Sequence, residues 1–229
     1  MAEVVVVLLL ALLGLLGGHE AHRGACPPPI GLHDSICSNV DGRAGEERVG
    51  IEIRSGPTAW LVVRFADHSI AKRVVSEDTE DPDLDVEQTF VNGLAALDHR
   101  PGLAIVITVH EGASTAFGQL FRIERGALRR ISSPATAGGE FAYEGSVGHF
   151  NVIDCVRKRS GLIWISGYGL DGSSHYIQER TLYRLVGDKL VPVRHESSRP
   201  AVSDAGRFRE FAEPQPFPHC LVVRSAKTH

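Results

Sequence analysis

Apolar residues in this chain come in short runs that are broken by glycine, proline or charged residues. Residues 60–63, 103–107 and 162–165 are such runs, and residues 49, 51 and 53 form an alternating apolar set. Short runs and a period of two are typical of β-strands, since a helix shows a longer pattern with a period near 3.6. Further strands are predicted at residues 117–123, 127–131, 176–186, 190–193 and 221–223. The sequence therefore predicts an all-β fold.

Helical patterns are few. Val86, Phe90 and Leu94 have the spacing of one helical face. Ser203 is a residue type that caps helices, and the segment after it carries two phenylalanines. The sequence thus predicts a short helix near the C-terminus and little other helix.

The start of the chain is a continuous apolar run over residues 4–18. This length suits the apolar region of a signal peptide and is shorter than the about 20 residues that span a bilayer. Residues 1–25 are therefore predicted to be a signal peptide or, if uncleaved, a membrane anchor. A lipoprotein would use Cys26, but Arg23 stands where an aliphatic residue is expected. Residues 26–35 are predicted to be a Pro-rich linker, and residues 36–229 a single β-rich domain.

The chain has four cysteines, an even number. Disulfides are expected because exported proteins reside where such bonds persist. Three connectivities are possible, and the favoured one joins Cys26 to Cys37 and Cys155 to Cys220. The second bond would close a long loop, which stabilises by about 4 kcal/mol in the chain-entropy model. A zinc site is disfavoured because no two cysteines have C-x-x-C spacing.

An internal repeat is the most informative feature of the pattern. An apolar residue is followed by aspartate at Asp41, Asp98 and Asp154, with spacings of 57 and 56 residues. Each aspartate precedes a polar loop and then β-runs, which predicts three degenerate, blade-like β-meander repeats. The expected arrangement is partially propeller-like or made of stacked antiparallel sheets. Each aspartate is expected to stabilise a turn by accepting a hydrogen bond from the backbone two residues on. The repeats are predicted near residues 40–75, 97–131 and 153–193.

Two of these loops resemble a known signature. Residues 40–46 and 98–106 are similar to FG-GAP or VCBS-type repeats, in which an Asp- and Gly-rich loop precedes a buried strand. Across residues 38–224, the order of turns and aromatic strands also resembles small secreted proteins and lipoproteins of actinobacteria, which have no established reaction. The resemblance implies an exported β-repeat protein.

Repeats of the resembled kind often bind calcium through several loop carboxylates. Here Arg43 and Arg100 stand where further carboxylates would be needed, and their positive charge opposes a divalent cation. The two loops are therefore expected to serve as turns. The acidic run over residues 76–85 is expected to be a solvated loop, with calcium binding as the alternative.

Charge and motifs argue against several other function classes. The formal net charge is −4, and acidic and basic residues are interleaved along the chain without a basic stripe, so no nucleic-acid partner is predicted. The sequence lacks the glycine-rich loops that bind phosphate, so no nucleotide cofactor is expected. The histidines are scattered, and no metal site is predicted from them. His110 and His149, which each follow an apolar stretch, are expected to donate hydrogen bonds between repeats.

Two serines are candidate nucleophiles. Ser114 lies in a Gly-rich stretch, but a nucleophile elbow would require glycine at position 116, which is Ala116. Ser146 lies near His149 and Asp154, although spacing alone does not show that the histidine reaches the hydroxyl. An extracellular serine hydrolase is therefore an alternative, and no catalytic residue is predicted.

The favoured hypothesis is a secreted or envelope-associated binding module for an envelope protein or glycan. Repeats of this type cluster their loops on one face, where exposed Tyr168 or Tyr176 would contact the partner, and a contiguous polar loop face without aromatic residues would count against such contacts. Contact with a membrane is expected only through residues 1–25 if they are uncleaved. A second alternative is a purely structural β-module of the envelope, which predicts no well-formed pocket.

Overall fold

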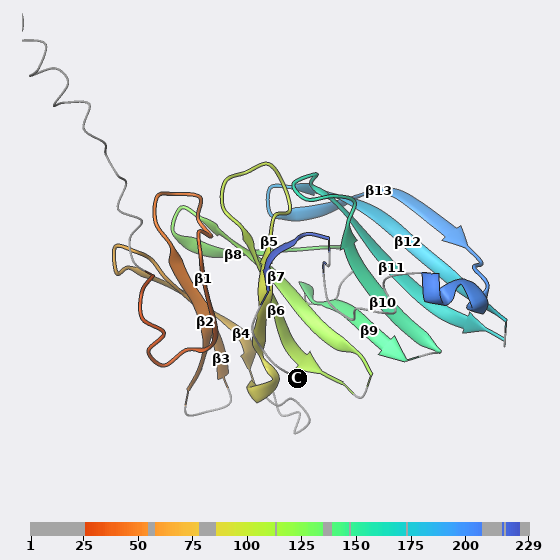
Figure 1. Cartoon of the computed structure of the whole chain (residues 1–229), viewed down its shortest axis with the longest axis horizontal. Helices are drawn as coiled ribbons and strands as arrows, with labels where there is room; N and C mark the ends of the chain where they lie inside the picture. The colour runs from red at the N-terminus through yellow and green to blue at the C-terminus, as the bar shows by residue number, and fades with distance from the viewer. Residues whose placement is uncertain are drawn as a thin grey trace, which may run out of the picture.

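The structure is a computed structural model that describes residues 26–54, 58–77, 86–112, 114–134, 139–146, 148–172, 174–207, 217 and 219–224. Its strands pair into a four-stranded and a ten-stranded antiparallel sheet (Figure 1). The prediction of an all-β fold is confirmed. Within the described ranges, neither sheet closes on itself and no propeller forms.

The four-stranded sheet is a meander, which we call the first meander. Across its middle, Ile51 lies opposite Leu61 and Val49 lies opposite Val63, so alternate apolar residues share one face. That face is fully buried and forms one side of a hydrophobic cluster. The strands are β1 (His33–Ser38), β2 (Glu47–Arg54), β3 (Thr58–Arg64) and β4 (Ile70–Glu77).

The ten-stranded sheet contains two more meanders. The second meander consists of β5 (Phe90–Ala95), β6 (Ala104–Glu111), β7 (Ala116–Glu124) and β8 (Ala127–Ile131). The third consists of β10 (His149–Cys155), β11 (Leu162–Asp171), β12 (His175–Val186) and β13 (Lys189–Ser198). Strand β9 (Phe141–Ser146) pairs with both β7 and β10 and so joins the two. Strand β14 (Leu221–Arg224) pairs with β5.

The second meander lies between the other two and is buried on both faces (Figure 1). Ile105 and Ile107 of β6 pack in the cluster with the first meander, whereas Val106 packs in the cluster with the third. This explains why residues 103–107 read as a continuous apolar run, since a strand that is buried on both faces needs no polar side.

The three predicted repeats each contain three consecutive antiparallel strands. Residues 40–75 cover β2 and β3 and most of β4, residues 97–131 cover β6 to β8, and residues 153–193 cover β11, β12 and the start of β13. In each case the strand before these three, namely β1, β5 or β10, completes the meander. The second and third meanders share one sheet through β9, which differs from separate propeller blades.

Both helical predictions need correction. Residues Val86–Gln88 form a short 3-10 turn (η1), but Phe90 and Leu94 lie in strand β5, opposite residues of β6. Strand β5 is buried on nearly all sides, and such a strand cannot be told from a helix by a few apolar positions. Near the C-terminus, η3 (Val202–Arg207) is a 3-10 helix, and residues 208–216 lie outside the described residues.

The predicted linker is part of the folded domain. Strand β1 begins at His33, three residues before the predicted start of the domain. The Nε atom of Arg48 donates a hydrogen bond to the Pro27 carbonyl (2.8 Å), and Arg64 donates to the carbonyls of Pro28 (3.0 Å) and Ile30 (2.5 Å). These bonds hold the proline stretch against the first meander. The acidic run over residues 76–85 begins with the end of β4, and its residues 78–85 lie outside the described part of the chain.

Both disulfides have the favoured connectivity. Cys26 is bonded to Cys37 and Cys155 to Cys220, with Cα–Cα distances of 6.2 and 5.5 Å. Two such bonds are typical of proteins in an oxidising, extracytoplasmic compartment. Among the described residues, no helix has the length and apolar character of a membrane span.

Candidate binding surface at the loop end

Six turns lie at the same end of the molecule, which we call the loop end (Figure 1). Consecutive strands of a meander run in opposite directions, so every second turn falls at one end. The first strand of each meander leads into this end, and so does the third. The turns of the loop end comprise residues 39–46, 65–69, 96–103, 125–126, 156–161 and 187–188.

The first and second meanders touch through two glycines of the loop end. Gly42 has φ +79°, and a Cβ atom there would lie 2.5 Å from Cβ of Pro101. Gly102 has φ +85°, and a Cβ atom there would lie 2.6 Å from the Val40 carbonyl oxygen. Glycine is therefore required at both positions, by conformation and by space.

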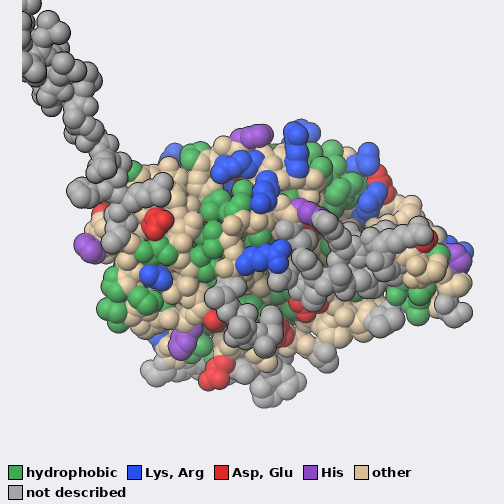
Figure 2. Space-filling view, in the orientation of Figure 1, with side chains coloured by type: hydrophobic (Ala, Val, Ile, Leu, Met, Phe, Trp, Pro, Cys, Tyr) green, Lys and Arg blue, Asp and Glu red, His purple; other side chains and the backbone are tan. Residues whose placement is uncertain are grey.

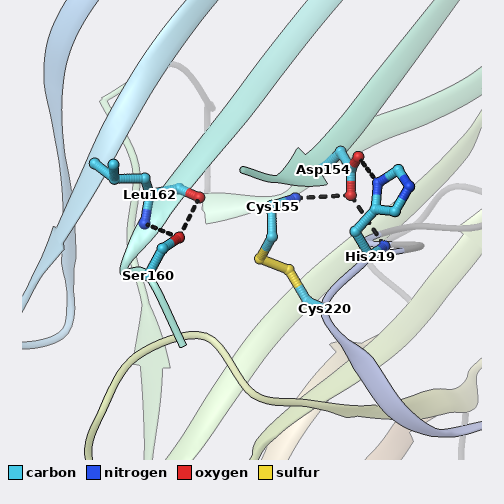
Figure 3. The surroundings of a disulfide bond; sticks show 6 residues. All are labelled: Asp154, Cys155, Ser160, Leu162, His219 and Cys220. Carbon is cyan, nitrogen blue, oxygen red and sulfur yellow. Dashed lines mark hydrogen bonds and ion pairs between the residues drawn. A yellow bond between two sulfur atoms is a disulfide. The ribbon is translucent and has the colours of Figure 1, made fainter. Parts of the chain in front are cut away.

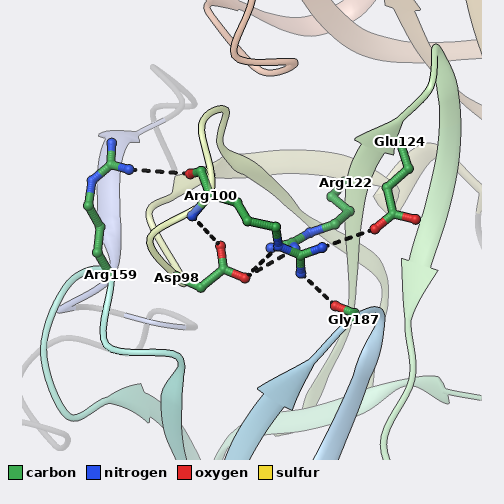
Figure 4. Close-up of polar contacts among 6 residues, drawn as sticks. All are labelled: Asp98, Arg100, Arg122, Glu124, Arg159 and Gly187. Atoms are coloured by element: carbon green, nitrogen blue, oxygen red, sulfur yellow. Dashed lines mark hydrogen bonds and ion pairs between the residues drawn. The ribbon is translucent and has the colours of Figure 1, made fainter.

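Asp98 is the centre of a polar network that joins the second and third meanders (Figure 4). Its Oδ2 atom accepts hydrogen bonds from Nε of Arg100 (2.9 Å) and Nη1 of Arg122 (3.2 Å). Arg100 also donates to Oε1 of Glu124 (3.1 Å) and to the Gly187 carbonyl of the β12–β13 turn (2.6 Å). The carboxylates of Asp98 and Glu124 are thus already paired within the network.

The β10–β11 turn, residues 156–161, is fixed to the second meander by its backbone. The amide of Arg159 donates to the Ala96 carbonyl (2.7 Å), and that of Gly161 donates to the Leu97 carbonyl (2.8 Å). The amide of Leu185 in turn donates to the Gly161 carbonyl (2.7 Å). These bonds hold the turn in one conformation and leave the Arg157, Lys158 and Arg159 side chains exposed.

The three predicted turn aspartates have different environments. Asp41 and Asp98 accept hydrogen bonds from the backbone amides two residues on, those of Arg43 (2.7 Å) and Arg100 (3.2 Å). Asp154 instead lies in strand β10, so its assignment to a turn is wrong.

Asp154 ties the segment before β14 to the third meander (Figure 3). Its carboxylate accepts hydrogen bonds from the amides of Cys155 (2.7 Å) and His219 (3.1 Å) and contacts Nδ1 of His219. The disulfide from Cys155 to Cys220 lies beside these bonds. Asp154 therefore has a structural role at the junction between β10 and β14.

Two pockets open between the turns of the loop end. The first, of about 180 Å³, is lined by Asp41, Glu47, Asp67 and Ser69 among others. Burial raises the pKa of Glu47, which is 2% exposed, although the Val40 amide donates a hydrogen bond to its carboxylate. The second pocket, of about 160 Å³, has walls from the loop before β6 and from the end of β7. Within the described residues, no group of three or more His, Cys, Asp or Glu side chains could hold a metal ion.

The charges of the loop end are segregated in space. The second and third meanders contribute residues 98–102, 122–129, 156–161 and 184–189, which we call the basic surface. These segments hold nine Lys or Arg residues and three Asp or Glu residues, a net charge of +6 in a chain whose total is −4. Figure 2 shows Lys and Arg side chains gathered on the upper half of the molecule, where these turns lie. The carboxylates that line the first pocket, those of Asp41, Glu47 and Asp67, belong to the first meander, and Gly126 of the basic surface forms one edge of that pocket.

The two tyrosines expected at the partner surface are buried. Tyr168 and Tyr176 are 1% and 2% exposed and pack with Phe150, on which the ring of Tyr168 stacks at 4.2 Å. The prediction of exposed tyrosine contacts is therefore wrong. Side chains alternate between the two faces of a strand, and both tyrosines lie on the face of the third meander against which Val202 of η3 packs.

The candidate serines lie at the end of the molecule opposite to the loop end. Ser114 is exposed in the β6–β7 connection, and Ser146 of β9 lies opposite His149 of β10. No hydrogen bond between either serine and a histidine is found among the described residues, and Asp154 binds His219 instead of His149. His110 stacks on Phe117 at 4.4 Å, within the second meander rather than between meanders.

Comparisons with protein-family models, with curated proteins and with solved structures found no match to this chain.

Proposed function

We propose that this protein is an extracytoplasmic binding module of the cell envelope, that its contact surface is the loop end, and that its three meanders are degenerate copies of one unit. Two disulfides and the apolar run at residues 4–18 support a location outside the cytoplasm. The strands of each meander follow one another in the same up-and-down order, which supports the repeat.

The observation that carries this proposal is the way the turns are tied together. Gly42 of the first meander packs on Pro101 of the second. Arg100 of the second meander donates a hydrogen bond to the Gly187 carbonyl of the third, and the Gly161 amide of the third donates to the Leu97 carbonyl of the second. All three meanders therefore contribute to one continuous surface. Loops on a rigid scaffold are common positions for binding residues, because the scaffold orders them before the partner arrives. A binding surface of this kind loses little conformational entropy on association.

The test is retention of the full chain on washed envelope fragments from the organism that makes it. Ala127→Cys at the loop end and Ser114→Cys at the opposite end are each coupled to a bulky maleimide-linked polymer. Both positions are exposed. We expect the unlabelled variants and the Ser114-labelled protein to be retained, and the Ala127-labelled protein to pass through.

Each other outcome counts against the proposal. If the unmodified chain is not retained, it is not an envelope-binding module, and the structural-module alternative is favoured. If the label at position 114 blocks retention and that at position 127 does not, the contact surface lies at the opposite end.

A further inference from the structure

We infer that the basic surface binds an anionic glycan, a polysaccharide with carboxylate or phosphate groups repeated along its chain. This inference rests on the proposed function and specifies its ligand. It starts from seven exposed basic side chains that have no ion pair within the described part of the chain. These are Arg125, Arg129, Arg157, Lys158, Arg159, Arg184 and Lys189.

Within its four segments, acidic residues do not balance the positive charge of this surface. The carboxylates of Asp98 and Glu124 bind Arg100 and Arg122, which leaves Asp188 as the remaining acidic residue of the four segments. A surface that carries one sign of charge attracts ligands of the opposite sign. An anionic partner therefore complements this surface.

The surface is also held in place. Arg159 and its turn are fixed by the bonds to Ala96 and Leu97, and Arg159 donates through Nη1 to the Arg100 carbonyl (3.4 Å). The backbone that carries Arg157, Lys158 and Arg159 is therefore fixed, and several cations are presented together, which favours a ligand with several charges over a single small anion.

The composition of the surface favours a glycan over a folded protein. Its four segments contain no Phe, Tyr or Trp, and their exposed large apolar residues are two separate valines, Val156 and Val186, which are 49% and 56% exposed. Protein–protein interfaces are enriched in aromatic residues and depleted in lysine at their centres. A surface that recognises charge without an apolar anchor fits a hydrated, anionic polymer such as an envelope glycan.

The experiment measures binding of the full chain, with its disulfides intact, to polygalacturonate, phosphorylated dextran and unmodified dextran. We expect binding to one or both charged polymers and none to dextran, and the two charged polymers distinguish carboxylate from phosphate. The affinity should fall steeply between about 50 and 200 mM salt, because bound counterions are released on association. Anionic phospholipid vesicles and duplex DNA serve as comparison probes.

The variant that tests the surface is Arg157→Gln combined with Lys158→Gln. Both side chains are exposed, so the fold is retained. We expect the affinity to fall by about tenfold. The slope of log affinity against log salt concentration should become shallower by about 1 for each removed charge that contacts the polymer. The control is Lys72→Gln with Arg199→Gln, which removes the same charge from ion pairs with Glu52 and Asp171 outside the basic surface. The control should bind like the parent chain.

The inference is overturned by three results: no preference for charged polymers over dextran, tighter binding to vesicles or DNA than to the glycans, or an equal loss in the control variant. Its failure is separable from that of the proposed function. If the Arg157 and Lys158 variant is retained on envelope fragments as well as the parent, and the label at position 127 still blocks retention, the loop end binds a different ligand. If nothing is retained, both proposals fail.

Discussion

At the scale of single residues, Gly42 and Gly126 share a left-handed backbone conformation, with φ of +79° and +77°. They differ in space, since a Cβ atom at Gly126 would have no atom within 4 Å, whereas at Gly42 it would meet Pro101. We predict that Gly126→Ala lowers the free energy of unfolding by about 1 kcal/mol, the cost of the conformation alone. Gly42→Ala should cost about 3 kcal/mol, since the loops must also separate.

Urea unfolding of the two variants measures this difference directly. Equal losses would show that the contact between the first and second meanders does not contribute to stability.

A second residue-scale prediction concerns Glu47. Its folded-state pKa is raised by burial, so the fold loses stability as the pH rises from the ordinary value of 4.5 through the raised folded-state pKa, and the loss is complete above it. Glu47→Gln keeps an oxygen that can accept the hydrogen bond from Val40 and removes the charge. The variant should therefore melt at a higher temperature than the parent at pH 7, and the difference should vanish below pH 4.5.

Glu46→Gln is the matched control, because Glu46 is the exposed neighbour. It should change the melting temperature little at either pH. A Glu47→Gln variant that is less stable than the parent at neutral pH would show that the carboxylate is stabilised as an anion.

At the scale of elements, the loop before β6 depends on Asp98. We predict that Asp98→Ala lowers the free energy of unfolding by about 1–3 kcal/mol, because Arg122, whose side chain is 10% exposed, loses its carboxylate. Asp188→Ala in the β12–β13 turn is the control and should change it by less than about 0.5 kcal/mol. Thermal unfolding at low and high salt measures both variants. Equal effects would mean that the network in Figure 4 contributes no more than an ordinary surface carboxylate.

The elements that the sequence predicts correctly are those with strong local patterns. Strands β3, β6, β7, β12 and β14 coincide with apolar runs between turn residues. Strand β5 could not be distinguished from a helix, because its few apolar residues are buried through pairing with β6 and β14. Strand β1 follows three prolines and shows no clear pattern. Its place is set by pairing with β2 and by the Cys26–Cys37 bond.

At the scale of the whole molecule, the two disulfides close loops of different lengths, with sequence separations of 11 and 65. Replacing Cys155 and Cys220 by serine should lower the free energy of unfolding by about 4 kcal/mol, and replacing Cys26 and Cys37 by about 3 kcal/mol. Denaturant unfolding of the two double variants checks this. A larger loss on removal of the Cys26–Cys37 bond would mean that attachment of the N-terminal segment to the first meander stabilises the fold more than attachment of β14 does.

The basic surface could not be predicted from the sequence, although every lysine and arginine in it is visible there. Along the chain, its four segments are separated by acidic and neutral stretches, so the charges look evenly mixed. They meet because alternate turns of antiparallel meanders fall at one end and because β9 joins the second meander to the third. The run Arg157, Lys158 and Arg159 was the one local signal of this surface.

The central claim is that the loop end is the contact surface. Hydrogen–deuterium exchange of the full chain, with and without washed envelope fragments, tests it most directly. The account predicts slower exchange in peptides that cover turns of the loop end, above all those of the basic surface at residues 97–103, 125–129, 156–161 and 187–189, with β9 and the β6–β7 connection unchanged. Protection confined to the opposite end, or no change anywhere, would contradict it.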